Sequence, residues 1–474
     1  MTLTGHYIAG HLAAGEPGRA TPVHNPSTGE VIGAAAEADP GQVSAAVAAA
    51  AAAAPAWGSL PVAERARYLS AWQDKLAAEA GPLLELTVDE MGLIPGFARN
   101  IHVARAANCL TGLDKMAETV LQPRHAANSV VVREPAGVVA AITAWNFPMH
   151  QLVSKIAGAL VMGNTVVAKP SELKPLAAWR VTQLLAETGL PPGVANVVGG
   201  TGPAVGAALA ADPAVDVISF TGSVATGRSV LAASAASITR SILELGGKSA
   251  ALILPDAPLD DAIAAAMGSC MFNNGQVCGA QSRLIVHVSQ LAEIEERLAA
   301  IVGQTVVGPA RSEGTTLGPV VSSAQLDRVT GYIRYGIESG LRMIAGGAEP
   351  PAGVPDGGYY VRPTVFSPVP ADHRLAQEEI FGPVLVVQAC RDVDEMVAVA
   401  NSTSYGLAGA VWSADLDQAV GVARRIRSGQ VQVNGGAFNL HAPYGGFGES
   451  GNGREHGLEG LAEFTEVKSM QLPA

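Results

Sequence analysis

The stretch Thr165-Val-Val-Ala-Lys-Pro170 is a short apolar run that ends at a lysine and a proline, and a helical segment follows from Ala177 to Thr188. A second apolar run, Ala195-Asn-Val-Val198, comes next and leads through Gly199-Gly-Thr-Gly202 into another helical segment. Apolar runs of four or five residues separated by helices of ten or more are typical of βαβ units around a parallel sheet. We therefore predict an α/β fold with this stretch at its centre.

The same alternation extends in both directions along the chain. Runs at Val130-Val-Val132, Val138-Val-Ala-Ala-Ile142 and Asp216-Val-Ile-Ser-Phe220 flank the central stretch. Similar runs occur in the second half, namely Ala250-Ala-Leu-Ile-Leu254, Leu284-Ile-Val286, Val384-Leu-Val-Val387 and Gln430-Val-Gln-Val-Asn434. No linker divides the chain cleanly, and we expect two α/β lobes.

The N-terminal region predicts helices. Nine of the ten residues from Ala45 to Ala54 are alanine, the best helix former, and Gly41-Gln-Val-Ser44 offers a start. We expect this helix to end at Pro55. A second helix is expected from Pro61 to about Ala80.

The composition limits the class of protein. The chain has 474 residues, 48% of them hydrophobic, which is enough for two to four domains of about 150 residues. Thirty basic and 42 acidic side chains give a net charge of −12, which disfavours nucleic acid and anionic membrane surfaces as partners. The sequence has no run of 18 strongly apolar residues and no signal-peptide pattern at its N-terminus. It predicts a cytoplasmic protein with no membrane span.

The four cysteines, Cys109, Cys270, Cys278 and Cys390, contain no C-x-x-C pair. Their spacing suggests neither a disulfide framework nor a zinc ribbon, so we expect a reducing compartment and no metal. Cys278 is the candidate nucleophile, because Gly275, Gly279 and Ala280 around it permit close approach by a ligand. Its thiolate is a minor species unless the surroundings lower a pKa of about 8.5. A packed core thiol is the alternative, and the residues alone leave both open.

Glu244 interrupts the apolar run Ser241-Ile-Leu-Glu-Leu-Gly-Gly247. A buried, unpaired carboxylate is costly, so Glu244 is either paired or kept for proton transfer. The alternative is a half-buried strand that places Glu244 in solvent.

Asn146, in Trp145-Asn-Phe-Pro148, stands between a strand and a helix. Its amide could donate to a developing oxyanion, or it could cap the helix. The segment Phe220-Thr-Gly-Ser-Val-Ala-Thr-Gly227 puts glycines and hydroxyls at a strand-to-helix turn, where backbone N–H groups favour phosphate. Its spacing is not G-x-G-x-x-G, so it is weak evidence for a dinucleotide by itself.

Six motifs in this order resemble the aldehyde dehydrogenase superfamily over essentially the whole chain. They are Asn146, Lys169-Pro-Ser-Glu172, Phe220-Thr-Gly-Ser223, Glu244-Leu-Gly-Gly-Lys248, Gly275-Gln-Val-Cys278 and Glu378-Glu-Ile-Phe-Gly-Pro383. The resemblance implies a Rossmann-like NAD-binding domain (residues 1–120 and 137–246) and an α/β catalytic domain (247–448). It also implies a small β oligomerisation element (121–136 and 449–474).

The resemblance further implies the oxidation of an aldehyde to a carboxylic acid. Cys278 would attack the aldehyde to give a thiohemiacetal, with the oxyanion held by the Asn146 amide and the Cys278 backbone N–H. Hydride would then leave for the nicotinamide, and Glu244 would activate the water that hydrolyses the resulting thioester. Lys155 and Glu455 match a pair used for proton relay, although Lys155 could instead be an ordinary solvated helix residue.

NAD is the implied cofactor, with NADP as the alternative. Glu172 favours NAD because a carboxylate at the ribose repels a 2′-phosphate. The residues that the resemblance assigns to cofactor binding are Trp145, Lys169, Ser171, Glu172, Phe220, Gly222, Ser223, Gly246, Glu379 and Phe381.

The implied partners are a small-molecule aldehyde and further copies of this chain. Val130–Ala136 and Thr465–Pro473 resemble the family's oligomerisation ribbon, whose edges are satisfied by a second subunit, so we expect a homodimer or homotetramer.

His150, Gln151 and Ser154 would make the substrate tunnel more polar than usual, and His150 is expected to be a helix-face residue rather than a catalyst. A CoA-acylating enzyme, against which Glu244 argues, and a catalytically silent family scaffold are the alternative functions.

Overall fold

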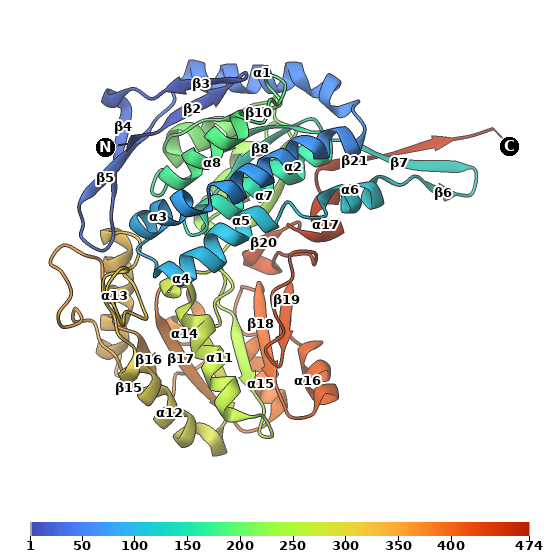
Figure 1. Ribbon diagram of the computed structural model, residues 1–474. Helices are drawn as coiled ribbons and strands as arrows, with labels where there is room; N and C mark the ends of the chain where they lie inside the picture. The colour runs from blue at the N-terminus through green and yellow to red at the C-terminus, as the bar shows by residue number, and fades with distance from the viewer. Residues whose placement is uncertain (1, 474) are drawn as a thin grey trace.

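Two sheets of mainly parallel strands organise the chain, one in each lobe (Figure 1). The computed structural model describes residues 2–473. The first lobe contains an eight-stranded sheet in the order β20-β12-β11-β8-β9-β10-β2-β3. Its parallel strands are β8 (Val138–Ile142), β9 (Thr165–Lys169), β10 (Ala195–Val197), β11 (Val217–Thr221) and β12 (Arg240–Glu244), and its antiparallel edges are β2 (Gly5–Ile8), β3 (His11–Ala14) and β20 (Gly451–Asn452).

Both faces of this sheet are buried, as strand β8 shows. Val138, Ala140 and Ile142 belong to one hydrophobic cluster, and Val139 and Ala141 belong to another. Because successive side chains of a strand point to opposite faces, helices must cover both sides of the sheet. The cluster that contains Val138 includes side chains from α1 (Pro40–Gly58), α9 (Ala207–Ala211) and α10 (Val224–Ser234). The cluster that contains Val139 includes side chains from α2 (Val62–Ala78), α3 (Ala80–Met91), α5 (Ala104–Asn108), α6 (Leu113–Leu121), α7 (Pro148–Val161) and α8 (Leu176–Ala186).

The sequence predicts that helix α1 ends at Pro55, but in the structure the helix continues to Gly58. A proline inside a helix removes one backbone hydrogen bond. The last turn is nevertheless anchored, because the buried Trp57 donates from Nε1 to the Leu160 carbonyl at 3.1 Å. This tertiary contact overrides the local preference of the sequence.

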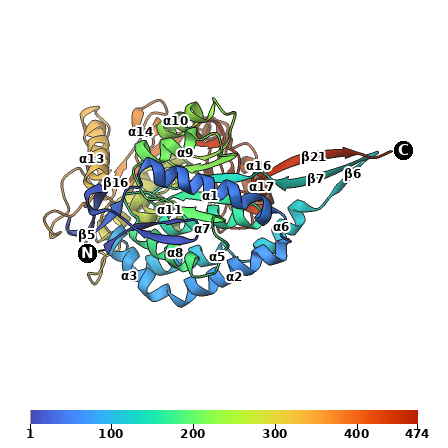
Figure 2. The ribbon, with the colours of Figure 1, turned by 90° about the horizontal axis from the view of Figure 1, so that it is seen from above.

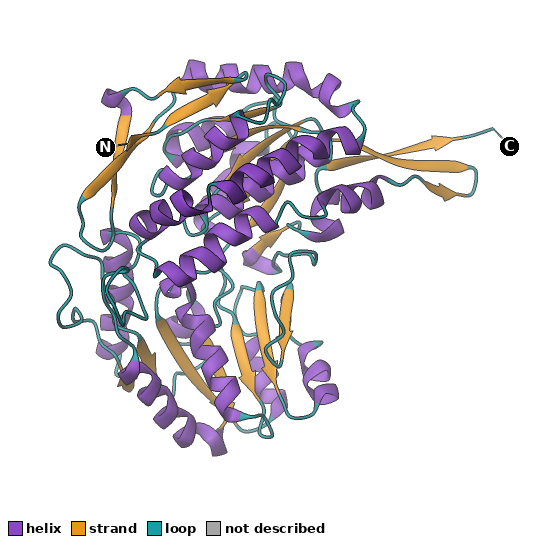
Figure 3. Cartoon of the chain, viewed as in Figure 1, coloured by secondary structure: helices purple, strands orange, loops and turns teal. Residues whose placement is uncertain are grey.

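The second lobe is built on a seven-stranded sheet in the order β15-β16-β17-β14-β13-β18-β19. All of its strands are parallel except the edge strand β15. Figure 3 shows helices on both sides of these strands. The strands are β13 (Ala250–Ile253), β14 (Arg283–His287), β15 (Met343–Ala345), β16 (Thr364–Phe366), β17 (Val384–Cys390), β18 (Ala408–Trp412) and β19 (Gln430–Val433), and the main helices are α11 (Leu259–Met271), α12 (Leu291–Gln304), α13 (Ser323–Glu338), α15 (Val393–Ala400) and α16 (Leu416–Ala423).

A β ribbon projects from the body of the molecule in two perpendicular views (Figures 1 and 2). It consists of β6 (Arg124–Ala126), β7 (Ser129–Pro135) and β21 (Thr465–Gln471), all antiparallel, with β7 in the middle. Strand β20 also lies within residues 449–474, but it pairs with β12 in the eight-stranded sheet. The C-terminal segment therefore contributes to both the ribbon and the first lobe.

The mixed α/β architecture agrees with the prediction. The remaining elements include a small sheet of β1 (Thr2–Leu3), β5 (Val31–Ala36) and β4 (Ala20–His24), and the short helix α17 (Gly457–Ala462). Among residues 2–473, no helix has both the length and the apolar character needed to cross a membrane.

Candidate active site

Cys278 follows a turn with a strained backbone. Asn273, Asn274 and Gly275 have φ values of 53°, 58° and 79°, in the left-handed region that favours glycine. A Cβ on Gly275 would lie 2.2 Å from the carbonyl carbon of Gly382, so the close approach of the two backbones also requires glycine there. Strained backbone of this kind persists only where the surrounding structure fixes it, and it clusters at functional sites.

The Cys278 thiol is half-buried, and its Sγ lies 3.1 Å from the Tyr444 hydroxyl oxygen. Burial and then the negative charge of Glu244 raise the pKa of this thiol, whereas the hydrogen bond with Tyr444 acts to lower it. At neutral pH the thiol is therefore protonated in the free protein. It needs a base to become a nucleophile.

Glu244 is the last residue of β12 and is only 3% exposed, so the expectation of a solvated side chain is wrong. Burial, and then repulsion from Glu455, raise the pKa of Glu244. Within residues 2–473, its Oε1 has no hydrogen-bond partner. Burying a carboxylate oxygen that accepts no hydrogen bond costs free energy of folding, which makes Glu244 a strong candidate for proton transfer.

Asn146 is buried, and both polar atoms of its side-chain amide are hydrogen-bonded. Its Nδ2 donates to the Gln276 carbonyl at 3.1 Å, and its Oδ1 accepts from Gln151 Nε2 at 3.1 Å. The N-cap of α7 is Phe147, which has no side-chain capping bond, so Asn146 does not act as the helix cap. An amide nitrogen has two N–H groups, and the one not used on Gln276 remains available to a ligand.

Lys155 is buried in α7, so the alternative of a solvated helix residue is wrong. Its Nζ forms an ion pair with Glu455 and donates to Ser219 Oγ at 2.9 Å. Burial, the largest single effect, acts to raise the pKa of Glu455, but the charges of Lys155 and His456 and the hydrogen bonds from Lys155 and Thr221 together outweigh it, so the pKa is lowered. The two residues form a buried ion pair beside Glu244.

Two cavities meet at the thiol. Their volumes are about 360 and 220 Å³, and both are lined by Thr221, Glu244 and Cys278. Concave, partly apolar sites with a few convergent polar groups are typical of ligand binding. We call them the larger and the smaller cavity. The nucleophile candidate can thus be reached from two sides.

The smaller cavity contains most of the residues predicted to bind a cofactor. Cβ atoms on Gly222 and Gly246 would lie 2.4 Å from the Phe220 ring and 2.3 Å from Glu379 Oε2, so only glycine fits these walls. Predicted residues that line this cavity are Trp145, Gly222, Ser223, Gly246, Glu379 and Phe381, joined by Asn146, Gln325 and Arg328. Phe220 itself is buried beneath Gly222 and does not line it.

Several features of the smaller cavity suit a phosphate and a ribose. Ser223 is the N-cap of α10 and accepts from the Thr226 N–H at 3.2 Å, so the positive end of this helix faces the cavity. Burial raises the pKa of Glu379 to about 7, and its Oε1 accepts from the Gly247 N–H at 3.0 Å. Phe381 has a left-handed φ of 64°, and its ring lies edge-on to the Trp145 ring, with the two ring centroids 5.3 Å apart.

Lys169 is the last residue of β9, and Ser171 and Glu172 follow it; all three lie outside both cavities at the thiol. Lys169 Nζ forms an ion pair with Glu172 Oε2 at 3.0 Å, and Gly202 N–H donates to Glu172 Oε1 at 3.4 Å. The structure therefore separates the predicted cofactor residues into two groups. One group lies beside the thiol and the other lies at the end of β9.

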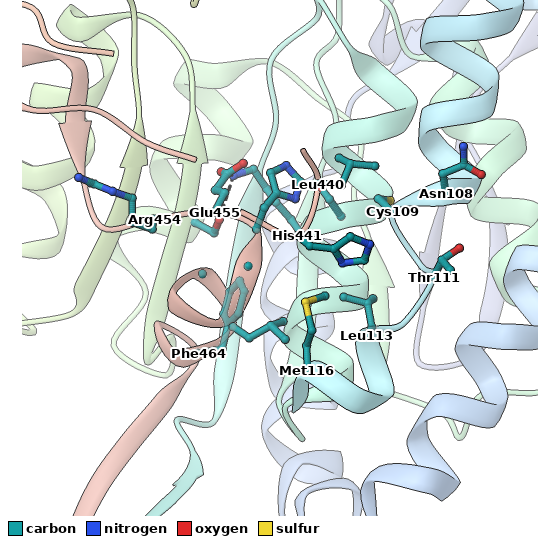
Figure 4. Close-up of a pocket in the computed structure, with 18 residues that line it drawn as sticks. Asn108, Cys109, Thr111, Leu113, Met116, Leu440, His441, Arg454, Glu455 and Phe464 are labelled. Atoms are coloured by element: carbon teal, nitrogen blue, oxygen red, sulfur yellow. Dashed lines mark hydrogen bonds and ion pairs between the residues drawn. The ribbon is translucent and has the colours of Figure 1, made fainter. Parts of the chain in front are cut away.

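A third cavity, with Glu455 in its lining, is shown in Figure 4. Its volume is about 40 Å³, which leaves room for two or three water molecules. Lys155, Glu455 and Ser154 line it, so Ser154 is not part of the wall at the thiol. Because Glu455 also lines the larger cavity, this carboxylate separates two solvent-sized spaces.

The larger cavity includes residues whose importance sequence reasoning missed. Tyr444 contacts the thiol and exchanges two backbone hydrogen bonds with Glu455, at 2.6 and 2.7 Å. Arg105 also lines this cavity, although no sequence pattern marks it. His150 lines the cavity too, and its ring stacks on His456 with centroids 5.3 Å apart. Burial lowers the pKa of His150, which keeps it uncharged.

Comparisons with known proteins agree with this architecture. The model of the aldehyde dehydrogenase family matches residues 13–470. Over 340 residues the chain is 45% identical to 3-succinoylsemialdehyde-pyridine dehydrogenase of a Pseudomonas species, covering 72% of this chain and 71% of that protein. The chain therefore belongs to the aldehyde dehydrogenase family, a family of oxidoreductases.

Two solved structures cover almost the entire chain. One is a cysteine-to-alanine mutant of aldehyde dehydrogenase C from Pseudomonas syringae in complex with NAD+ and octanal, with a TM-score of 0.97, 41% identity and coverage of 99% of this chain and 97% of that one. The other is Mycobacterium tuberculosis aldehyde dehydrogenase complexed with NAD+, with a TM-score of 0.96, 39% identity and coverage of 100% and 99%. The fold of the whole chain is thus that of aldehyde dehydrogenases.

Proposed function

We propose that this protein oxidises an aldehyde to a carboxylic acid with NAD, through a thioester on Cys278. The observation that carries the proposal is the position of Cys278 between two cavities, with the unpartnered Oε1 of the Glu244 carboxylate and a free amide N–H beside it. The larger cavity would take the aldehyde, and the smaller cavity would take the nicotinamide end of the cofactor.

In the first step the Cys278 thiol loses its proton to Glu244 and attacks the carbonyl carbon. Burial raises the pKa of both groups, and the charge of Glu244 raises that of the thiol further, so the pair carries one negative charge more readily than two. The carbonyl oxygen becomes an oxyanion, which the second N–H of Asn146 Nδ2 and the Cys278 backbone N–H stabilise. Loss of one such donor typically costs about 3–4 kcal/mol of transition-state stabilisation.

The residues of the smaller cavity fit a dinucleotide. Its glycine walls leave backbone exposed, the N-terminus of α10 suits a pyrophosphate, and Glu379 can accept from ribose hydroxyls. The Lys169–Glu172 pair would bind the adenosine ribose, and the Glu172 carboxylate favours NAD over NADP. When bound, the oxidised nicotinamide supplies the acceptor for the hydride that leaves the substrate carbon.

Once Glu244 has passed the thiol proton on, it activates the water that hydrolyses the thioester. Its raised pKa and the free capacity of Oε1 to accept a proton suit a general base. The released proton would pass by way of Glu455 and Lys155 to the third cavity. This pair lies between Glu244 and that cavity, as a relay requires.

Two variants test the proposal. Cys278→Ala should reduce aldehyde-dependent NADH formation by at least about 10⁴-fold, because the covalent step is lost. Glu244→Gln should form about one NADH per site, more slowly than the first turnover of wild type because the thiol has lost its base, and then stall because its thioester is not hydrolysed; mass spectrometry should find the acyl group on Cys278. Cys390→Ala is the matched control, because Cys390 is buried in β17 away from the cavities and should retain normal turnover.

The outcomes also separate the alternatives. Full turnover by the Cys278→Ala variant would overturn the proposal. Acceleration by CoA, with acyl-CoA as the product, would indicate a CoA-acylating enzyme instead. Binding of NAD without turnover of any aldehyde in a broad panel would indicate a silent scaffold.

The β ribbon supports an oligomer as the functional unit. Strand β21 is paired only with β7, and its other edge is free in the part of the chain that the structure describes. Val467, Met470 and Leu472 are exposed large apolar side chains on or next to this strand. An unpaired strand edge is normally covered by another part of the protein or by another chain. In a homodimer or homotetramer, a second subunit would cover the free edge of β21.

A further inference from the structure

Arg105 is a cation without a counter-ion in the larger cavity. Its guanidinium carbon lies 4.7 Å from the centroid of the Phe438 ring and 5.8 Å from that of Phe147. Across residues 2–473, its guanidinium forms no ion pair and no hydrogen bond. The aromatic rings contact the guanidinium through cation–π interactions, and such contacts leave N–H groups free to donate.

The other charged groups of this cavity do not balance Arg105. Glu455 is already paired with Lys155, and Glu244 makes no ion pair or hydrogen bond with Arg105 among the residues that the structure describes. Burial lowers the pKa of His150 and of His456, which keeps both rings neutral. Arg105 therefore gives the larger cavity an uncompensated positive charge.

Amide side chains add hydrogen-bond donors to the same wall. Gln281 Nε2 donates to Gln432 Oε1 at 2.8 Å, which leaves the Gln432 amide N–H groups free to donate. Both residues and Gln430 line the larger cavity. The lining of the larger cavity thus combines one cation with neutral hydrogen-bond donors, an environment that favours the binding of an anion.

We propose that Arg105 binds an anionic group at the far end of the substrate, so that the preferred aldehydes are ω-oxo carboxylates. The inference deepens the proposed function and rests on it. A carboxylate can accept two parallel hydrogen bonds from a guanidinium, and this replaces the solvation that Arg105 loses on burial. Oxidation of such an aldehyde consumes NAD and water and yields a dicarboxylate, NADH and two protons.

The test compares two probes that differ only in charge at the far end. These are 5-oxopentanoate and its methyl ester, with kcat/KM measured for each with NAD. We expect the wild-type protein to prefer the anion, and Arg105→Met to lower the ratio of the two kcat/KM values about 30-fold, the loss of one charge-assisted contact. Arg105→Lys should restore part of the ratio, because it keeps the charge but not the planar fork.

Arg99→Met is the matched control. Arg99 lies on the same helical segment but is exposed and lines neither cavity at the thiol, so its loss removes the same charge without touching the wall. The ratio should stay within about twofold of wild type, since an exposed charge is screened by solvent. A cationic probe, 4-trimethylammoniobutanal, should be a poor substrate of the wild-type protein and improve in Arg105→Met.

The results distinguish this inference from the proposed function. If the methyl ester is oxidised but the anion is no better, or if Arg105→Met leaves the ratio unchanged, the role of Arg105 is wrong and the dehydrogenase activity stands. If the wild-type protein oxidises neither probe nor any neutral aldehyde, the proposed function itself fails.

Discussion

Gln151 holds the side chain of Asn146 in one orientation. Gln151 Nε2 donates to Asn146 Oδ1 at 3.1 Å, and Gln151 Oε1 accepts from the Ala144 N–H at 2.8 Å. Both polar ends of Gln151 are therefore used. Asn146 cannot exchange its oxygen and nitrogen without breaking this contact, so its second N–H points consistently toward the site.

Gln151→Met should slow the chemical step without weakening cofactor binding. The burst rate of NADH formation should fall about 10-fold, because Asn146 loses the bond that orients it, while the NAD dissociation constant stays within about twofold. Stopped-flow absorbance and fluorescence titration measure the two quantities. In a double-mutant cycle, Asn146→Ala/Gln151→Met should be no slower than Asn146→Ala. Fully additive losses would show that Gln151 acts independently of Asn146.

Tyr444→Phe should make the Cys278 thiol less acidic. The hydroxyl of Tyr444 favours the thiolate, so its removal raises the thiol pKa and moves the acidic limb of the pH–rate profile to higher pH. Alkylation by iodoacetamide at pH 7 should slow by about 10-fold, equivalent to one pKa unit. Tyr335→Phe is the control, because Tyr335 is exposed on α13 and lines neither cavity at the thiol. An unchanged alkylation profile in Tyr444→Phe would rule out this effect.

His102 should make the fold less stable as the pH falls. Burial lowers the pKa of this 1% exposed side chain to about 4, against 6.5 in the unfolded chain. Between these values the unfolded state binds the proton and the folded state does not, so stability is lost as the pH falls from 6.5 toward 4. Linkage gives a loss of about 1.4 kcal/mol at pH 5.5.

His102→Gln removes this titration and keeps a donor for Asn273 Oδ1, which the histidine ring contacts at 3.0 Å. The loss of unfolding free energy between pH 7.5 and pH 5.5 should be about 1.4 kcal/mol smaller in the variant than in wild type. Urea unfolding at the two pH values measures it. The same pH dependence in both proteins would show that His102 is protonated in the folded state.

Changes in the ribbon should affect assembly more than activity at the thiol. Wild type should have two or four times the chain mass of 48.2 kDa, and Val467→Asp/Met470→Asp should shift it toward 48.2 kDa. The reason is that both exposed side chains lie on β21, and a carboxylate there disfavours burial in an interface. Light scattering after gel filtration measures the mass. Leu416→Asp, at an exposed position on α16, should leave it unchanged, and a monomeric wild type would contradict the prediction.

The sequence by itself determined the α/β class and the nucleophile candidate. Short apolar runs such as Val166–Ala168 are buried on both faces of a parallel sheet, and this favours consecutive apolar residues, a pattern that the sequence alone reveals. Cys278, Glu244 and Asn146 were found because they lie in specific motifs. The end of α1 was not found, because the Trp57 contact that extends it past Pro55 comes from α7.

Only the tertiary structure decided which side chains surround the thiol and in what state. Tyr444 and Arg105 lie 166 and 173 residues from Cys278 along the chain, and the fold brings all three to one cavity. The burial of Glu244 and Lys155 also depends on strands and helices that pack over them. Burial and the charges nearby set a side chain's pKa and its free hydrogen-bond capacity, and both are properties of three-dimensional surroundings that no local pattern encodes.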